Sequence, residues 1–519
     1  MSDFGPAHRA APGAQPKLVL CVIDALAPAM LERAVAAGEA PTLATLMERG
    51  LYVPDCVAAF PSVTPVCAAS IATGTWQDRH EIPGMNWYHR GEHRYVEYGS
   101  SFRASQQVGF TRQLTDTVYN MNAAHLSRSV ETLFESLDDI DVRTAGTTYL
   151  MYRGRYRHEP QREGALARLA SALLRHAVMG PRELFYADIF ASRRTGCRST
   201  LGMPGVRDRH SGCVSAYLVE HDLFDFLLLS LPDNDWHSHR AGPDGQTRSI
   251  ALADVQLARV MEAGGGVDRF LEDHAVIVMA DHSQVAVTAT VSLQDELAEL
   301  GVLTPAGARA ALRGGSGKGG ARADAERQSI AVCPSQRAAM VYLLDQEQPA
   351  RLRDAVVRRA LDIDGVDLVM WSRGDSHGDV EEGVIASAGH DELRFRPDGD
   401  VMDERGRGWS VRGDLDVLEA SIAYGRLHAP AYPLALERVW SALTCPTSGD
   451  LLFSAAPGYE FCDWGGQAHV GGGSHGSLRA EDSLGALIVC GGQPPYERQQ
   501  WTISDVAKLV RGHFGLEPN

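Results

Sequence analysis

Residues 17–24, KLVLCVID, decide the fold of this chain, because an apolar run rich in Val, Leu and Ile ends there abruptly at a carboxylate. Two later stretches have the same form: FDFLLLSL at 224–231 and AVIVMA at 275–280. Continuous apolar runs of this length are typical of parallel strands that helices cover on both faces. The sequence therefore predicts an α/β protein with a mostly parallel sheet.

Polar residues of the kind that bind metals follow these runs. Because ligands bind beyond the carboxyl ends of parallel strands, we expect these side chains to share one site. The candidates, in chain order, are Asp24, Thr64, Asp235, His239, Asp281, His282 and His475. Carboxylates and imidazoles without cysteine are typical of catalytic rather than structural zinc. The set predicts a two-metal centre for phosphoryl transfer.

Five stretches extend the pattern over almost the whole chain. They are VIDAL at 22–26, FPSVTPVCAASIATG at 60–74, DNDWHSHRAGP at 233–243, MADHSQ at 279–284 and GGSHGS at 472–477. In this order the chain resembles the alkaline phosphatase superfamily, most closely its nucleotide pyrophosphatase/phosphodiesterase branch. The resemblance implies an alkaline-phosphatase-like core and a metal-dependent hydrolase of phosphoric esters.

The resemblance also implies a role for each candidate ligand. One metal would be held by Asp235, His239 and His475. A second would be held by Asp24, Asp281 and His282, with Thr64 as the nucleophile that bridges to it. Two Zn²⁺ ions are expected, with Mn²⁺ or another divalent ion as the alternative. A metal beside Thr64 would lower the pKa of its hydroxyl, so an alkoxide would form without a general base.

Two neighbours compete for these roles. Asp233 and His237 form a second D-x-x-x-H pair, but only His239 lies four residues before Pro243, as the family's H-x-x-G-P motif requires. His469 competes with His475, and the small residues of GGGSHG favour His475 because glycine lets the backbone approach a metal closely.

The nucleophile segment has one expected feature and one departure from the family. Thr64 precedes Pro65 and a periodic apolar stretch, which predicts that Thr64 is the N-cap of a helix whose amides face the phosphate. The family usually has an Asn three residues after the nucleophile to bind a phosphate oxygen, and this chain has Cys67. Asn86 or a backbone amide is expected to replace it.

Arg153 and Arg155 follow the predicted strand RTAGTTYLMY, roughly where phosphomonoesterases of the superfamily place a Lys-x-Arg pair. Arginine binds phosphate bidentately, so these residues are candidates for binding the extra charge of a monoester. The alternative is a basic surface loop.

Composition limits the possible partners and location. The net charge of −17 over 519 residues argues against nucleic-acid polymers as targets. The polar N-terminus is unlike a signal peptide, and the first apolar run is far shorter than the ~20 residues of a membrane span. Nine cysteines without paired spacing predict buried free thiols in a reducing compartment. A cytoplasmic protein that binds no membrane is expected, and its oligomeric state is not indicated.

The motif positions predict the organisation of the chain. A metallo-phosphoesterase core would comprise 17–290 and 471–516, with 84–215 as a lid or substrate wall. An α+β insertion would span 291–470, with a mobile Gly/Arg-rich loop at 304–327, and residues 1–16 would be flexible. The stretch 246–264 is amphipathic and predicts a helix that connects two core strands.

We expect a two-zinc hydrolase that cleaves a phosphoric diester or a nucleotide pyrophosphate through a phospho-Thr64 intermediate. A phosphomonoesterase is the alternative, and a metal-binding pseudoenzyme comes third. The substrate would be a small phosphorylated molecule.

Overall fold

The computed structural model describes residues 16–161, 175–186, 189–198, 203–312, 328–345, 347–374, 380–491 and 499–517. The predicted flexible segment 1–16 lies outside these ranges except for its last residue. Most of the predicted mobile loop 304–327 also lies outside them, but Pro305–Leu312 form a helix, α14.

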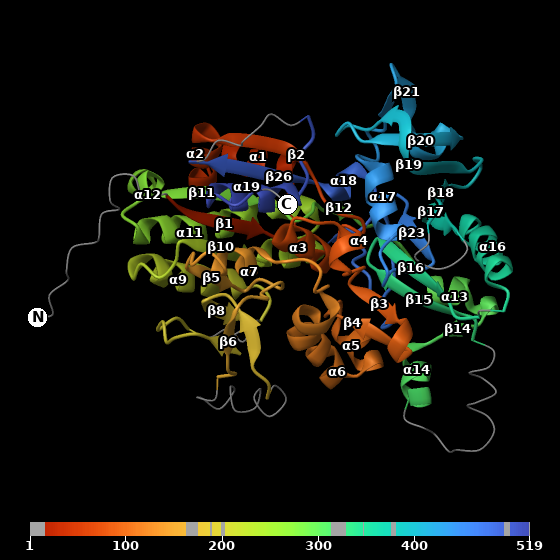
Figure 1. Cartoon of the computed structure of the whole chain (residues 1–519), viewed down its shortest axis with the longest axis horizontal. Coiled ribbons are helices and arrows are strands. Elements are labelled where there is room, and N and C mark those ends of the chain that lie inside the picture. Colours follow the sequence, from red (N-terminus) through yellow and green to blue (C-terminus); the bar gives the residue numbers. More distant parts are fainter. Residues whose placement is uncertain are drawn as a thin grey trace, which may run out of the picture.

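A mostly parallel sheet forms the core of one half of the molecule (Figure 1). Within the described ranges its eight strands are, in spatial order, β2 (Leu51–Val57), β26 (Leu484–Cys490), β11 (His274–Met279), β1 (Lys17–Ile23), β10 (Phe226–Leu231), β5 (Thr144–Thr147), β8 (Glu183–Tyr186) and β9 (Phe190–Ala191). Neighbouring strands from β11 to β8 are parallel, whereas β26 and β9 run antiparallel to their neighbours. The apolar runs of the sequence supply the three central strands.

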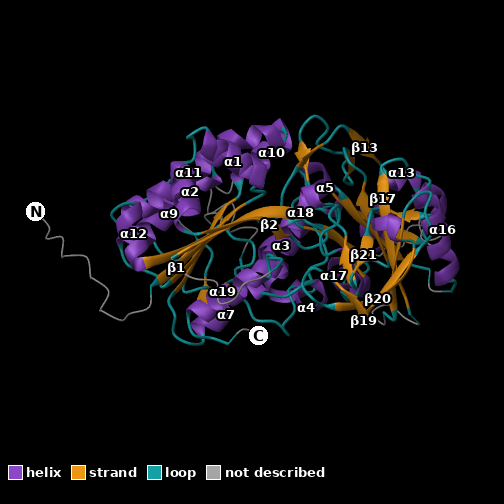
Figure 2. Cartoon of the chain, turned by 90° about the horizontal axis from the view of Figure 1, so that it is seen from above, coloured by secondary structure: helices purple, strands orange, loops and turns teal. Residues whose placement is uncertain are grey.

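Helices cover both faces of this sheet (Figure 2). Those on one face are α1 (Pro28–Ala36), α2 (Pro41–Arg49), α9 (Arg207–Glu220), α11 (Gln246–Ala263) and α12 (Val267–Asp273), and those on the other are α3 (Thr64–Thr73), α7 (Leu133–Asp138) and α19 (Asp505–His513). Alternate residues of β1 pack into the two resulting cores, which explains why the strand is apolar throughout. The predicted fold class is confirmed, and none of the helices in the described ranges is long and apolar enough to cross a membrane.

A second sheet forms the other half of the molecule, on the right of Figure 1. Its strands among the described residues are β14 (Val302–Leu303), β15 (Ile330–Ser335), β16 (Ala338–Leu343), β23 (Leu451–Ala455), β17 (Val366–Arg373), β18 (Glu382–Ala386), β19 (Leu393–Met402), β22 (Arg426–His428) and β21 (Ser421–Ala423), with β20 (Gly408–Gly413) paired to β19. Helix α16 (Pro349–Leu361) packs on one face and α17 (Ala435–Leu443) on the other. This α+β unit lies inside the stretch that we expect to be an insertion.

The described ranges also contain shorter helices and strands outside the two large sheets. They are α4 (Gln77–His80), β3 (Asn86–His89), β4 (Arg94–Glu97), α5 (Phe102–Val108), α6 (Phe110–Thr115), a π-helix at Asp116–His125, β6 (Tyr156–His158), β7 (Val178–Gly180), α10 (Asp233–Ala241), β12 (Val285–Ala286), β13 (Ala289–Val291), α13 (Leu293–Glu296), β24 (Tyr459–Phe461), β25 (Gly473–Ser474) and α18 (Ala480–Ser483).

We expect the stretch 84–215 to form a lid or substrate wall. Part of it belongs to the core instead, because β5, β8 and β9 extend the central sheet. Its aromatic residues divide into two groups. Trp87, Tyr88, Tyr95 and Tyr98 are buried core residues, whereas two phenylalanines nearby are exposed, Phe102 at 67% and Phe110 at 49%. Most of these aromatic side chains are therefore unavailable to stack on a substrate.

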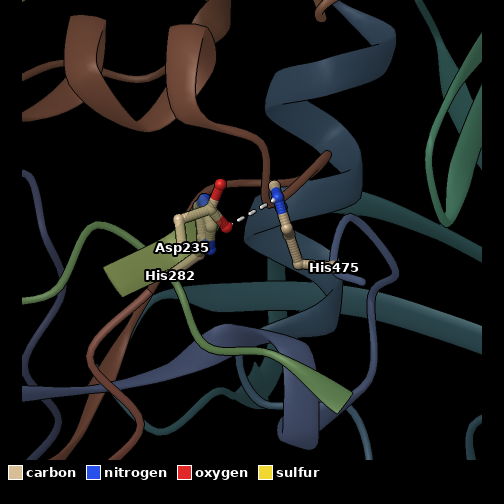
Figure 3. A group of neighbouring side chains, drawn as sticks. All are labelled: Asp235, His282 and His475. Carbon is tan, nitrogen blue, oxygen red and sulfur yellow. Dashed lines mark ion pairs between the residues drawn. The ribbon is translucent and has the colours of Figure 1, made fainter. Parts of the chain in front are cut away.

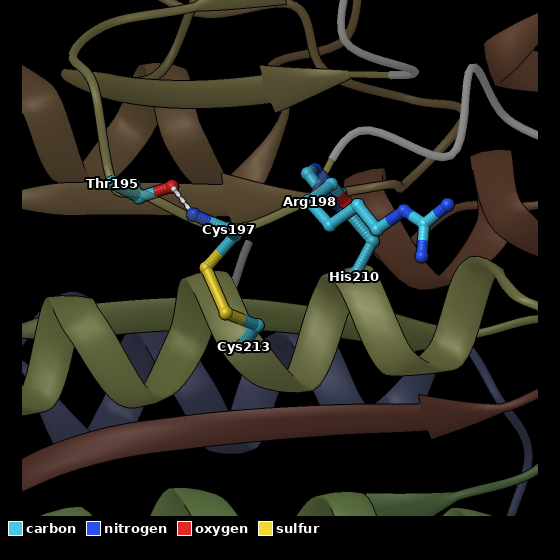
Figure 4. Close-up of a disulfide and its surroundings, with 5 residues drawn as sticks. All are labelled: Thr195, Cys197, Arg198, His210 and Cys213. Carbon is cyan, nitrogen blue, oxygen red and sulfur yellow. Dashed lines mark hydrogen bonds between the residues drawn. A yellow bond between two sulfur atoms is a disulfide. The ribbon is translucent and has the colours of Figure 1, made fainter.

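The prediction of nine free thiols is wrong for two cysteines. Cys197 forms a disulfide with Cys213 of α9 (Figure 4), while the other seven cysteines of the described ranges are free. The loop after β9 returns along α9 and brings the two sulfurs together. Sequence spacing does not show this return, because the two cysteines belong to different elements.

Candidate metal centre

The register of the central sheet brings three carboxylates to one edge. Strand β1 pairs in parallel with β10 up to the last residue of each, with Ile23 opposite Leu231. Asp24 follows β1 directly, Asp235 lies in the first turn of α10 after β10, and Asp281 follows β11. The shared edge, predicted from the apolar runs, is thus a consequence of strand length and register.

The imidazole of His282 is the centre of one group of side chains. Its Nε2 lies 3.3 Å from Thr64 Oγ1, 3.4 Å from an Asp281 carboxylate oxygen and 3.6 Å from Asp24 Oδ1. One ligand atom of each of Asp24, Asp281 and His282 lies within 4.8 Å of the others, a spacing that one ion could bridge. All three residues are buried.

Asp235 is the centre of the adjoining group. Its two carboxylate oxygens lie 3.5 Å from His475 Nε2 and 3.2 Å from His239 Nε2. The rings of His282 and His475 stack with centroids 3.7 Å apart, so the two groups of side chains are in direct contact. Figure 3 shows Asp235, His282 and His475 converging from separate segments.

The three imidazoles are oriented by the backbone. Each Nδ1 donates a hydrogen bond to a carbonyl: His239 to Gly473 at 2.7 Å, His282 to Ser283 at 3.0 Å and His475 to Ser62 at 2.7 Å. A carbonyl only accepts, so Nδ1 carries the proton and Nε2 presents its lone pair to the centre. Metal-binding histidines are typically held in this way.

The charges of the centre fit divalent cations. Burial, then repulsion from Asp281 and Asp235, raises the pKa of Asp24 well above its ordinary value. Burial also raises the pKa of Asp235, but the imidazoles, His239 foremost, outweigh it and hold that pKa below the usual range. Among the described residues, Asp24 Oδ1 and His475 Nε2 are buried without a hydrogen-bond partner. Buried oxygen and nitrogen atoms that lack a hydrogen-bond partner and lie beside clustered carboxylates can serve as ligands of Zn²⁺ or a similar ion.

Thr64 is the first residue of α3 rather than its N-cap. The carbonyl of Val63 accepts the first helical hydrogen bonds, from Val66 and Cys67 at 3.1 Å each, so Val63 occupies the cap position. The hydroxyl of Thr64 is consequently free to contact His282. The other nine residues of α3 are buried and Thr64 is half-exposed, so the helix presents this side chain alone.

The structure separates the competing residues. Asp233 accepts hydrogen bonds from the amides of Gly205 and Asp208 and from the Arg207 side chain, so its carboxylate has structural partners. His469 stacks on the ring of His239 with centroids 4.0 Å apart, and its Nδ1 is 2.8 Å from a Glu460 oxygen.

Asn86, one of the two expected replacements for the family Asn, is bound elsewhere, and Cys67 at the family position is buried. Asn86 is buried and donates to the Pro334 carbonyl at 2.7 Å, which commits its amide to the second sheet. Cys67 is buried inside α3, and burial raises the pKa of its thiol well above the ordinary value, so the group is neutral.

Arg153 and Arg155 are bound by other protein groups. Arg153 lies 3.0 Å from Glu135 and also donates to the carbonyls of Leu126 and Ser127. Arg155 pairs with Asp139, Glu131 and Glu135. These arginines line a cavity of about 450 Å³ whose lining contains none of the seven metal-type residues.

Gln284 is a contact that the sequence analysis does not single out. Its amide nitrogen donates to an Asp235 carboxylate oxygen and lies 3.4 Å from the Asp235 carbonyl, which fixes this carboxylate between two imidazoles. The sequence contains a signal for this contact, because Gln284 is the last residue of the motif MADHSQ, which also contains Asp281 and His282.

Comparisons with known proteins give the family and the fold of the chain. The chain matches the family model for type I phosphodiesterase / nucleotide pyrophosphatase over residues 18–379. A crystal structure of phosphonoacetate hydrolase from Sinorhizobium meliloti 1021 in complex with phosphonoformate is similar, with a TM-score of 0.55 and 16% identity, over 99% of this chain and 100% of that one. The complex with phosphonoacetate gives 0.54 with the same identity and coverage. At this identity both show the fold alone, and no curated protein sequence matches significantly.

Proposed function

The chain belongs to the type I phosphodiesterase / nucleotide pyrophosphatase family, and we propose that it cleaves a phosphoric diester or a nucleotide pyrophosphate through a phospho-Thr64 intermediate. Family membership makes it a metal-dependent phosphoric ester hydrolase. The number of metals, the nucleophile and the diester preference are the proposed part.

The proposal includes two metal sites. Asp24, Asp281 and His282 would hold one ion beside Thr64, and Asp235, His239 and His475 would hold the other. When bound, divalent ions supply positive charge to the phosphate and lower the pKa of a nearby hydroxyl. Gln284 holds the Asp235 carboxylate in place for this purpose.

Thr64 would carry out the first chemical step. Its oxygen forms a bond to phosphorus while the bond from phosphorus to the leaving oxygen breaks, and the hydroxyl proton passes to solvent. Water then attacks the phosphothreonine, the bond to Thr64 breaks, and a phosphate monoester is released with the threonine restored. The amino-terminal end of α3 faces the negative charge throughout, which favours its binding.

The contact between Thr64 Oγ1 and His282 Nε2 at 3.3 Å carries the proposal, because it puts the one half-exposed side chain of α3 against the candidate metal ligands. The ion pairs of Arg153 and Arg155 support the diester preference. A monoester brings an additional negative charge, and these arginines are already neutralised by carboxylates.

Substitution of the nucleophile tests the mechanism. Thr64→Ala should lose at least about 1,000-fold in kcat while its zinc content stays near that of the wild type, since a covalent nucleophile is lost. Thr64→Ser is the matched control and should keep much of the activity. Mass spectrometry of the quenched wild type should find phosphate on the peptide that contains Thr64. Turnover by Thr64→Ala above about a tenth of wild type would overturn the mechanism.

A pair of chromogenic substrates tests the preference. Zinc-loaded protein should have a higher kcat/KM for bis-p-nitrophenyl phosphate than for p-nitrophenyl phosphate. The reverse order would assign the chain to phosphomonoesters. Absence of turnover on both, together with two bound zinc ions, would indicate a metal-binding pseudoenzyme.

A further inference from the structure

The tip of a hairpin from the second sheet lies against the candidate metal centre. Strands β15 and β16 pair through Ser335 and Ala338, so Gln336 and Arg337 form the turn. Gln336 has φ of +61°, a left-handed conformation that is uncommon for a residue other than glycine. The Arg337 amide donates to the carbonyl of His475 at 3.0 Å, which joins the turn to a candidate metal ligand.

Arg337 fixes the position of this turn. Its guanidinium is 1% exposed, pairs with the buried carboxylate of Asp482, and donates to the Tyr459 and Ala456 carbonyls at 2.9 and 3.0 Å. The backbone of Gln336 is anchored as well, because its carbonyl accepts from the Phe461 amide at 2.9 Å. The turn is therefore a rigid part of the wall.

The side chain of Gln336 is not used by these anchors. Its Nε2 lies 3.5 Å from His239 Nε2. The lone pair of this His239 nitrogen is the one that would bind a metal. The Oε1 of Gln336 is buried and has no hydrogen-bond partner among the residues that the structure describes. Among the described residues the amide nitrogen makes only this 3.5 Å contact, so its hydrogens have capacity left for a ligand that accepts, while the unpaired oxygen could accept from a water molecule.

A chain of contacts through three imidazoles links Thr64 to Gln336. Thr64 contacts His282, whose ring stacks on His475; the His475 ring lies 5.2 Å from that of His239, and Gln336 contacts His239. In phosphoryl transfer the leaving oxygen departs opposite the nucleophile. A phosphate that Thr64 attacks from the His282 end of this chain would direct its leaving group toward the end at His239 and Gln336.

We propose that Gln336 is a substrate-binding residue whose carboxamide nitrogen donates to the leaving-group oxygen of the phosphoric ester. The proposal rests on the proposed function, since it takes Thr64 as the nucleophile. Occupation of the His239 lone pair by a metal would free both hydrogens of the amide. Because negative charge develops on the leaving oxygen, the contact would strengthen as the bond breaks.

Two measurements on zinc-loaded protein test this role. Gln336→Gly removes the side chain and suits the left-handed backbone, and Gln336→Asn, which also tolerates positive φ, shortens the reach. In a series of methyl aryl phosphates, both variants should lose about 10-fold in kcat/KM for the phenyl ester and less for the p-nitrophenyl ester, whose leaving oxygen needs less stabilisation. The affinity for inorganic phosphate, measured by calorimetry, should fall about 3- to 10-fold.

Controls distinguish substrate binding by Gln336 from a structural role of this residue. They also test it independently of whether Thr64 is the nucleophile. Gln348→Ala, at an exposed residue of the same unit, should change neither readout. Gln336→Gly in a Thr64→Ala background should still weaken phosphate binding, so the contact can be tested even if Thr64 is not the nucleophile. An equal loss for every leaving group, or an unchanged phosphate affinity, would overturn the assignment of Gln336.

Discussion

At the scale of single residues, the orientation of each side chain separates candidate ligands from their neighbours. Two histidines six residues apart illustrate this. His475 presents an unpaired Nε2 to the centre, whereas His469 is held by Glu460 and stacks on the outside of His239. Both burial and the partner of each ring nitrogen separate these roles, because the His475 side chain is 1% exposed and that of His469 is 32% exposed.

A matched pair of variants tests the choice between these histidines. His475→Ala should lower the zinc stoichiometry from about two toward one, because a site that loses one of three protein ligands binds weakly. His469→Ala should keep the wild-type stoichiometry, since its ring nitrogen is bonded to a carboxylate. Metal analysis after dialysis measures both. Loss of zinc from His469→Ala, with His475→Ala unchanged, would reverse the assignment.

Arg153 and Arg155 give a prediction of equal effects. Because carboxylates bind both side chains, Arg153→Ala and Arg155→Ala should change kcat/KM for p-nitrophenyl phosphate and for its diester by the same factor. A direct contact with phosphate would instead cost the monoester selectively, by about 10- to 100-fold. Steady-state kinetics on both substrates distinguish these outcomes. A selective loss of kcat/KM for the monoester would show that the arginines contact the phosphate.

At the scale of elements, the sequence predicts well those strands and helices that a local pattern of apolar residues determines. Strands β1, β10 and β11 are continuous apolar runs because helices bury both faces, so their type, direction and shared carboxyl edge could be predicted. The start of α3 is predicted one residue too late, because threonine is a preferred N-cap residue and valine is not. Only the hydrogen bonds to the Val63 carbonyl decide between them.

Long-range contacts explain the rest of what sequence could not predict. Gln336 reaches His239 across 97 residues, and the Cys197–Cys213 disulfide joins a loop to a helix. Both depend on how a hairpin or loop returns onto another element. The commitment of Asn86 to the Pro334 carbonyl is of the same kind. No spacing rule within one segment encodes these pairings.

The junction between α4 and α3 gives a prediction about pH. His80 is fully buried, its Nδ1 accepts from the Ile82 amide at 3.1 Å, and its Nε2 lies 3.1 Å from Ser70 Oγ of α3. Burial lowers the pKa of His80 from 6.5 to about 3, because the charged imidazolium would lose its hydration. The unfolded chain takes up this proton below pH 6.5 and the native state does not, so stability falls as pH drops from 6.5 toward 3.

The size of this effect is measurable by difference. At pH 4.5 the contribution of His80 to the loss of unfolding free energy, relative to pH 7, should be about 2–3 kcal/mol. His80→Gln lacks the titrating group and should show a correspondingly shallower decline in urea unfolding, both proteins being measured without metal. Parallel pH profiles of variant and wild type would show that His80 does not carry this dependence.

At the scale of the whole molecule, the candidate site lies where the two sheets meet. The central sheet supplies Asp24, Asp235, Asp281 and His282, while the second sheet supplies the hairpin tip that holds the segment of His475. Arg337 and Asp482 form a buried ion pair across this boundary, with side chains 1% and 0% exposed. The geometry of the site therefore depends on the docking of the two halves.

Removal of one partner of this pair tests that dependence. Arg337→Met should lower the free energy of unfolding by about 3–5 kcal/mol, because it leaves the Asp482 carboxylate buried without its cation. The double variant Arg337→Met/Asp482→Asn should recover at least about 1 kcal/mol relative to the sum of the single effects, since the uncompensated charge is gone. Arg269→Met, which breaks the exposed pair with Glu272, should cost no more than about 1 kcal/mol. Urea unfolding measures the wild type, Arg337→Met, Asp482→Asn, the double variant and Arg269→Met. If Arg337→Met cost no more than Arg269→Met, the two halves would dock without this ion pair, and the site would have to be held together by the remaining hydrogen bonds of the hairpin.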